Sequence, residues 1–251
     1  MDKQPIQLLI DGDVILYQVL LSCEQETHWK DDLWTMTTDL KQAKQKVIYE
    51  IDKLELDLGA SNSIIAFSCS TEDGFRRALN PSYKLNRKGN RKPMGFKILR
   101  KFMEDTYVSK AVPTLEADDV IGILMTTPSE YKRIIVSIDK DFYSVPGFFY
   151  RTCDDKPVVT EVTPQFANHF FACQTLAGDP VDGFGGVPGI GMKTAEKLLS
   201  GVDACDYWTT IVKAYEKKGL TKFDALLNAR MARILHASDW DNKNNKVINW
   251  E

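Results

Sequence analysis

The sequence predicts an α/β fold with a mostly parallel, twisted sheet flanked by helices. Short apolar runs at residues 6–10, 63–67 and 133–138 are typical of buried strands. Segments with helical spacing at residues 39–58 and 95–105 separate these runs along the chain. Because strands that alternate with helices form parallel sheets, this order favours one sheet with helices on both faces.

Acidic residues follow two of the predicted strands. The first run ends at Asp11, and the run at residues 133–138 leads into Asp139 and Asp141. Alternation along an extended chain places Asp139 and Asp141 on the same side. Since ligands of such sheets bind at the carboxyl ends of the strands, we expect these side chains to line a site.

A third acidic group stands in the segment LEADDVIGIL, whose apolar residues are typical of a packed helix. Glu116, Asp118 and Asp119 fall in its first turn, where the helix dipole stabilises negative charge. Glu116 and Asp119 are three residues apart and therefore share one face of the helix. Because the three groups converge on one edge of the sheet, their mutual repulsion predicts a bound cation.

Two divalent cations a few ångströms apart need several oxygen ligands, and such pairs of ions serve phosphodiester cleavage. Taken singly, each acid is more simply a helix cap or a surface residue. Their order and combination favour a metal site made of the carboxylates Asp11, Glu116, Asp118, Asp119, Asp139, Asp141, Asp179 and Asp182.

A glycine-rich segment follows a helix predicted at residues 163–177, and the tail at residues 203–236 is again helical in pattern. The segment is no nucleotide-binding loop, because Met192 separates its glycines from Lys193 and Thr194. Gly189 to Gly191 instead fit a hairpin between two short helices. Such a hairpin grips a DNA backbone through main-chain amides and a nearby lysine. The alternative is a plain turn between helices.

A basic run contrasts with the net charge of −3, which is unusual for a DNA-binding protein. The run YKLNRKGNRK contains no acid, so the charge of the chain is segregated. Its aromatic residue is expected to stack on a base while the cations hold phosphates, and Gly89 and Asn90 predict a mobile loop. A solvated surface loop is the alternative. The expected DNA-binding residues are Tyr83, Lys84, Arg87, Lys88, Arg91 and Lys92 of this run, with Gly189, Gly191, Lys193 and Thr194 of the hairpin.

Composition argues against several other classes of protein. The five cysteines are odd in number and widely spaced, which disfavours a disulfide framework and a structural zinc site. Only three histidines are present and none forms a ligand pair, so a zinc hydrolase is not expected. No stretch approaches the roughly 20 apolar residues that span a bilayer. We therefore expect a soluble cytoplasmic protein without a membrane partner.

Taken in order, six motifs resemble the 5′-nuclease superfamily of flap endonucleases and bacterial polymerase 5′-exonuclease domains. They are LIDGD, NPSYKLNRK, LEADD, SIDKD, AGDPVDG and GVPGIGMKTAEKLL. The likeness is strongest to the short 5′→3′ exonucleases of podovirus-type bacteriophages, which share a late segment like MARILHASDWDNKNNKVINW. The resemblance implies a PIN-like nuclease domain at residues 1–162, with a basic arch region near residues 76–105. It also implies a helical DNA-clamp region at residues 163–251, similar to a helix-hairpin-helix, that completes the metal site.

The resemblance also implies roles for single residues. Lys84 and Arg87 would contact the scissile phosphate. Many relatives carry an aspartate after the second strand, where this chain has Ser68 and Cys69, so Asp73 is considered as its replacement. The expected ions are two Mg²⁺, with Mn²⁺ as a substitute, and a K⁺ at the hairpin of residues 186–192. Asp11, Glu116, Asp118, Asp119 and Asp139 would form the first divalent site, and Asp141, Asp179 and Asp182 the second.

The function implied by the resemblance is metal-dependent 5′→3′ exonuclease or flap endonuclease activity on duplex DNA, with removal of RNA primers paired to DNA. Expected partners are DNA 5′ ends, flaps and RNA–DNA hybrids, together with replication proteins, for a monomeric enzyme. Two alternatives stay open. One is a PIN-type ribonuclease, and the other is a DNA-structure-binding protein with a catalytically impaired metal site.

Overall fold

A computed structural model describes residues 4–87 and 89–251 of the chain. Its central sheet has the strand order β5–β4–β1–β6–β7–β8. The first five of these strands run parallel, and β8 is antiparallel to β7. Their bounds are Ile6–Asp11 (β1), Asn62–Phe67 (β4), Ser109–Ala111 (β5), Lys132–Ser137 (β6), Gly147–Arg151 (β7) and Val159–Val162 (β8). The mostly parallel α/β architecture and its three predicted strands are confirmed.

Strand β1 is central, and its residues Leu8–Ile10 are fully buried. Leu9 pairs with Ile64 of β4 on one side and with Ile135 of β6 on the other. A continuous apolar run suits this position because helices cover both faces of a parallel sheet. Since β1, β4 and β6 run side by side in one direction, their carboxyl ends meet at one edge of the sheet.

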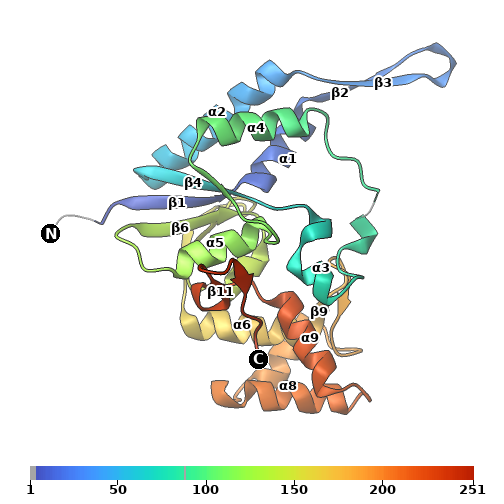
Figure 1. Cartoon of the computed structure of the whole chain (residues 1–251), viewed down its shortest axis with the longest axis vertical. Coiled ribbons are helices and arrows are strands. Elements are labelled where there is room, and N and C mark those ends of the chain that lie inside the picture. The colour runs from blue at the N-terminus through green and yellow to red at the C-terminus, as the bar shows by residue number, and fades with distance from the viewer. Residues whose placement is uncertain (1–3, 88) are drawn as a thin grey trace.

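Helices cover the two faces of the sheet (Figure 1). On one face lie α1 (Gly12–Cys23), α2 (Leu40–Leu58) and α4 (Phe96–Thr106), and on the other lie α5 (Ala117–Thr126) and α6 (Pro164–Ala177). Helix α2 begins where the sequence predicted, because the Asp39 side chain accepts hydrogen bonds from the amides of Lys41 and Gln42. Thr163 caps α6 in the same way, with Pro164 in the first turn. No described helix is long and apolar enough to span a membrane.

A two-stranded ribbon of β2 (Glu24–His28) and β3 (Trp34–Thr38) projects from the body between α1 and α2 (Figure 1). The sequence analysis did not predict it, because its strands are polar and have no buried face. At its tip, Trp29 and Leu33 are each more than half exposed. At its base, Glu24 forms a two-pronged ion pair with Arg91.

The glycine-rich segment differs from the predicted hairpin between two short helices. Helix α6 extends to Ala177, and a ribbon of β9 (Gly178–Asp179) and β10 (Phe184–Gly185) separates it from α7 (Met192–Leu199). The direct helix-to-helix hairpin was therefore wrong. The predicted helical tail is present as α8 (Tyr207–Glu216) and α9 (Lys222–Ala232), which pack with α6 and α7 around the buried Tyr215.

The last segment of the chain returns to the sheet. Ile234, Leu235 and Trp240 join the core cluster beneath the sheet together with residues of α5. The approach is close, since a Cβ on Gly122 of α5 would lie 2.5 Å from the Leu235 carbonyl oxygen. The short strands β11 (Trp240–Asp241) and β12 (Lys246–Val247) form a ribbon after this contact. The last segment therefore belongs to the core beneath the sheet, whereas helices α7, α8 and α9 pack in clusters of their own.

Candidate active site

Asp11 ends β1 and caps α1 at the carboxyl edge of the sheet. Its Oδ1 accepts a hydrogen bond from the Val14 amide (3.2 Å), and its Oδ2 accepts one from the Ser137 hydroxyl (3.0 Å). Burial raises the pKa of Asp11 to about 7, and the neighbouring Asp13 and Asp139 add to this rise. The strand end therefore presents a carboxyl group whose charge the protein compensates poorly.

Asp139 and Asp141 do not lie on an extended chain, so the alternation expected for IDKD was wrong. The chain turns into a 3-10 helix at Lys140–Ser144 because the Asp139 Oδ1 accepts a hydrogen bond from the Asp141 amide (2.9 Å). Burial raises the pKa of Asp141 to about 7, with further contributions from Asp139 and Asp179. The Asp141 Oδ1 is buried and has no hydrogen-bond partner among the described residues.

Glu116, Asp118 and Asp119 stand together at the start of α5, and their oxygens lie within 4.8 Å of one another. Glu116 is the N-cap rather than a first-turn residue, and the other two follow in the first turn. Burial would raise the pKa of Glu116, but Lys84 and Arg76 outweigh it and lower this pKa to about 2. For Asp118, burial and the adjacent Asp119 raise the pKa.

Asp119 is enclosed in a way that the sequence did not suggest. Its side chain is 0% exposed, and Arg76 donates to both of its oxygens at 2.7 Å. The amides of Glu116 and Leu235 donate to the same two oxygens, each at 3.2 Å. Four N–H donors therefore surround the Asp119 carboxylate, which also belongs to the group of three acids that could hold a metal ion.

Asp179 ends β9, and Asp182 lies in the turn between β9 and β10. The Asp179 Oδ1 accepts hydrogen bonds from the amides of Val181 (2.8 Å) and Asp182 (3.4 Å). The Asp182 carboxylate lies 3.6 Å from the Lys84 ammonium and pairs with Arg87, yet burial raises its pKa. This turn lies against the basic run, because the Lys84 amide donates to the Asp182 carbonyl (2.8 Å).

The basic run meets the carboxylates through Lys84, whose ammonium lies 2.5 Å from the Glu116 Oε1. The expectation that Tyr83 stacks on a base is wrong, since its ring is 3% exposed and packs near Phe184. The Tyr83 hydroxyl donates to the Glu116 Oε2 (2.8 Å). An aromatic ring with a polar end is well suited to such a position, where the ring is buried and the hydroxyl is bonded.

The other cations of the basic run differ in their partners and exposure. Arg87 is about half exposed at the edge of the site. Arg91 is held by Glu24 at the base of the ribbon, and Lys92 lies over the Phe96 ring at 4.5 Å. Lys88 lies outside the described residues. Lys84 and Arg87 are thus the two described cations of the run that contact carboxylates of the site.

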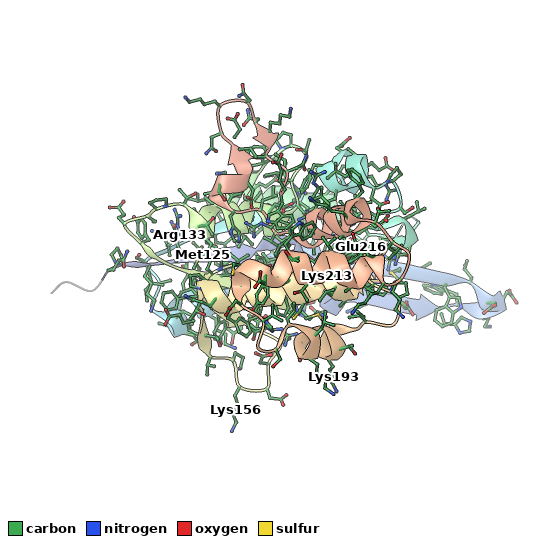
Figure 2. All side chains as sticks on the ribbon, turned by 90° about the horizontal axis from the view of Figure 1, so that it is seen from below. Met125, Arg133, Lys156, Lys193, Lys213 and Glu216 are labelled. Atoms are coloured by element: carbon green, nitrogen blue, oxygen red, sulfur yellow. The ribbon has the colours of Figure 1, made fainter. Side chains whose placement is uncertain are left out.

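The residues expected to contact DNA at the hairpin are exposed at the start of α7. Gly191 is the N-cap of this helix, so no side-chain cap bonds its first amides. Lys193 extends away from the ribbon into solvent (Figure 2). Gly189 has φ +83 and open space around it, and Thr194 is exposed. Among the described residues, no hydrogen bond or ion pair joins the side chains of this surface to the carboxylates of the site.

Two site residues escaped the sequence analysis. Asp13 stands in the LIDGD motif itself, and its Oδ2 accepts a hydrogen bond from the Ser68 amide (2.9 Å). Arg76 is buried beside Glu116. Its sequence context, a pair of adjacent arginines, gave no signal of burial. Asp73 is exposed in a 3-10 turn beside Ser70, and its role as a replacement ligand stays a prediction.

The donor set fits hard divalent cations. Carboxylate oxygens are the ligands that Mg²⁺ and Mn²⁺ prefer. The acids interact electrostatically in one series that runs from Asp11 through Asp139 and Asp141 to Asp182 and Glu116. Raised pKa values within the series mean that a cation there would relieve repulsion. The division into two metal sites is less distinct, since Asp182 and Glu116 share Lys84.

Comparisons with known proteins show the family of the chain. Residues 7–161 match the family model of the 5′-3′ exonuclease N-terminal resolvase-like domain. The chain is 28% identical to an exodeoxyribonuclease of Enterobacteria phage T3 and 27% identical to an exonuclease of Escherichia phage T7. In both cases the match covers 97% of this chain and 92% of the relative.

A solved structure shares the fold. It is a bacteriophage T5 flap endonuclease in a pseudo-enzyme–product complex with DNA and metal ions. The TM-score is 0.64 at 16% identity, and the match covers 91% of this chain and 88% of that one. The resemblance inferred from the motifs is therefore confirmed, and the chain belongs to the 5′-3′ exonuclease family.

Proposed function

We propose that this protein is a metal-dependent 5′→3′ exonuclease and flap endonuclease that hydrolyses phosphodiester bonds at the 5′ ends of duplex DNA. The observation that carries the proposal is the series of interacting carboxylates from Asp11 to Glu116, bordered by Lys84 and Arg87. The family of the chain supports the same reaction, because the phage T3 and T7 relatives are an exodeoxyribonuclease and an exonuclease.

Two Mg²⁺ ions, or Mn²⁺ in their place, would be held by Asp11, Glu116, Asp118, Asp139, Asp141, Asp179 and Asp182. The unpartnered Asp141 oxygen supports this assignment, because a buried oxygen without a donor suits a cation ligand. When bound, such ions stabilise charge on phosphate oxygens and make water easier to deprotonate. We assign Asp119 the role of orienting Glu116, since its own oxygens are fully hydrogen-bonded.

Lys84 and Arg87 would bind the phosphate at the cleaved bond. Both cations already lie beside carboxylates, so they can donate to phosphate oxygens without leaving the site. Fixed donors aimed at developing charge lower the reaction barrier. The two residues would therefore contribute mainly to turnover.

The duplex would be gripped away from the cut by the start of α7. Exposed amides at Gly189 and Gly191, with the outward Lys193 and the Thr194 hydroxyl, match the donors that hold a DNA backbone. A K⁺ ion at residues 186–192 is part of this proposal, as are phosphate contacts from Arg91, Lys92 and Lys88. We further propose that the protein acts as a monomer in the cytoplasm, together with replication proteins, and that it cuts RNA–DNA hybrids as well as DNA.

The test uses 5′-labelled and 3′-labelled duplexes, with and without a 5′ flap, in Mg²⁺, Mn²⁺ or EDTA. We expect short products from the 5′ label that require the metal, and loss of cleavage by at least about 1,000-fold when Asp139→Asn and Asp141→Asn are combined. Asp52→Asn combined with Asp57→Asn, both exposed on α2, is the charge-matched control. An RNA–DNA hybrid tests primer removal.

The same assay separates the alternatives. Cleavage of single-stranded RNA in preference to duplex DNA would identify a PIN-type ribonuclease. Binding of flapped DNA without turnover in either metal would identify a DNA-structure-binding protein. Unchanged cleavage by the doubly substituted variant would refute the proposed site.

A further inference from the structure

Arg76 on α3 (Phe75–Leu79) is a buried arginine whose five N–H groups all donate hydrogen bonds. Two nitrogens contact the site: Nη1 donates to the Glu116 Oε2 (3.0 Å) and the Asp119 Oδ2 (2.7 Å), and Nη2 to the Asp119 Oδ1 (2.7 Å). The remaining N–H groups reach the C-terminal segment. Nη2 donates to the Arg233 carbonyl (2.6 Å), and Nε donates to the Met231 carbonyl (3.1 Å).

The network joins three segments that are far apart in the sequence. Arg76 precedes Glu116 by 40 residues and the Met231 carbonyl by 155. The Asp119 Oδ1 accepts hydrogen bonds from both the Arg76 Nη2 and the Leu235 amide. Asp119 therefore also binds the C-terminal segment. The end of α9 and the start of α5 are therefore joined through Arg76 and Asp119.

Glu116 is the member of this network that faces the site. Its Oε2 is fixed by Arg76 and by the Tyr83 hydroxyl, while its Oε1 faces Lys84. Because two donors hold the Oε2 of Glu116, the orientation of its Oε1 is also fixed. Partners that orient metal ligands in this way typically change metal affinity or activity by about 10–100-fold when they are removed.

We propose that Arg76 is a positioning residue through which docking of the segment Met231–Leu235 orients Glu116 for metal binding. This inference rests on the proposed function, because it takes Glu116 as a metal ligand. The C-terminal region thus acts on the metal site through backbone carbonyls and not through a side-chain ligand. A buried ion pair adds little net stability, whereas it specifies geometry when every donor is satisfied.

The chemistry of the network requires arginine. Its planar fork donates to a carboxylate and to carbonyls on a second side at once, and a lysine ammonium has only three donors on one atom. Arg76→Lys retains the charge and loses the bridge. The adjacent Arg77, which donates to the Tyr83 carbonyl, offers Arg77→Lys as a matched control.

The experiment measures Mn²⁺ binding to the metal-free full chain by calorimetry and electron paramagnetic resonance, beside thermal unfolding and affinity for flapped DNA in Ca²⁺. For Arg76→Lys we expect Mn²⁺ affinity to fall at least about tenfold and kcat to fall similarly at low Mn²⁺, with partial recovery at high Mn²⁺. DNA affinity should change less than about twofold. Arg77→Lys should leave Mn²⁺ affinity unchanged.

A second variant guards against misfolding, since Arg76→Lys leaves Asp119 with fewer donors. Combining Arg76→Met with Asp119→Leu removes both buried charges, and we expect the same loss of Mn²⁺ affinity with a retained cooperative transition. Wild-type Mn²⁺ affinity in a folded Arg76→Lys or double variant would overturn the proposal. Failure of the wild-type protein to bind Mn²⁺ or cut DNA would instead overturn the proposed function.

Discussion

At the scale of single residues, the acids of the site differ in how far the protein compensates their negative charge. Asp11 and Asp141 have pKa values raised to about 7, chiefly by burial. Asp119, which is more deeply buried, is neutralised by Arg76. The difference lies in the partner, because a buried carboxylate is tolerated only when donors or a cation replace its water. Uncompensated acids therefore mark the part of the site that a metal ion would occupy.

Asp141→Asn should stabilise the metal-free protein while it removes activity. The folded carboxyl group titrates near pH 7 and the unfolded one near 3.8, so the folded state binds more protons between these values. Raising the pH through this window therefore lowers the free energy of unfolding. We expect a gain on the order of 1–3 kcal/mol at pH 8 in EDTA that shrinks toward pH 4. Chemical denaturation at both pH values tests this, and an equal gain at both would contradict it.

Lys84→Met should separate metal binding from turnover. The ammonium pairs with Glu116 and Asp182, so it competes with a divalent ion for these carboxylates. We expect Mn²⁺ to bind a few-fold more tightly, because the ammonium no longer competes for these carboxylates. We expect kcat to fall by about 100-fold, because a hydrogen-bond donor to the phosphate is lost. Calorimetry and single-turnover cleavage measure the two effects. Lys44→Met, a lysine over the Phe102 ring, is the control. Weaker Mn²⁺ binding would refute this account.

At the scale of elements, turns bring the last acids into place. Gly178 at the end of α6 has φ +66, and the chain comes back against it at Gly186. A Cβ on Gly186 would lie 2.2 Å from the Leu176 carbonyl oxygen. The ribbon of β9 and β10 can therefore close only without side chains at this crossing. That closure carries Asp179 and Asp182 to the sheet edge.

Gly186→Ala should destabilise the protein by at least about 2 kcal/mol, because the added Cβ meets backbone atoms that have no room to move. Gly185→Ala is the matched control, since nothing lies within 4 Å of its Cβ position. We expect this second change to alter the free energy of unfolding by less than about 0.5 kcal/mol. Urea titrations of both variants measure the contrast. Equal stabilities would show that the crossing is not closely packed.

At the scale of the whole molecule, the sheet and the C-terminal helices depend on each other. Ile234, Leu235 and Trp240 belong to the core beneath the sheet, and Ala167 of α6 joins them. The buried Arg76 bonds to two carbonyls of the same C-terminal segment. Removing that segment would expose apolar side chains and leave buried donors unpaired, which is costly.

A fragment of residues 1–162, the nuclease domain proposed from the sequence, should therefore not fold to a native state by itself. We expect it to bind a hydrophobic dye and to unfold without a sharp transition, as a molten globule does. The full chain should unfold in one cooperative step. Calorimetry and near-ultraviolet circular dichroism on both chains give the comparison. A sharp transition in the fragment would mean that the two regions fold independently.

The sequence by itself determined the family, the central strands, the capped starts of α2 and α6, and which carboxylates stand at strand and helix ends. These features depend on local apolar runs, side-chain caps and motif order, which neighbouring residues encode. Only the tertiary structure decided that Tyr83 is buried and that Arg76 rather than Arg77 binds the acids. Such outcomes depend on contacts between segments that lie far apart in the sequence; the contacts of Arg76, for example, span 40 to 157 residues. Packing alone decides which of the two adjacent arginines is buried.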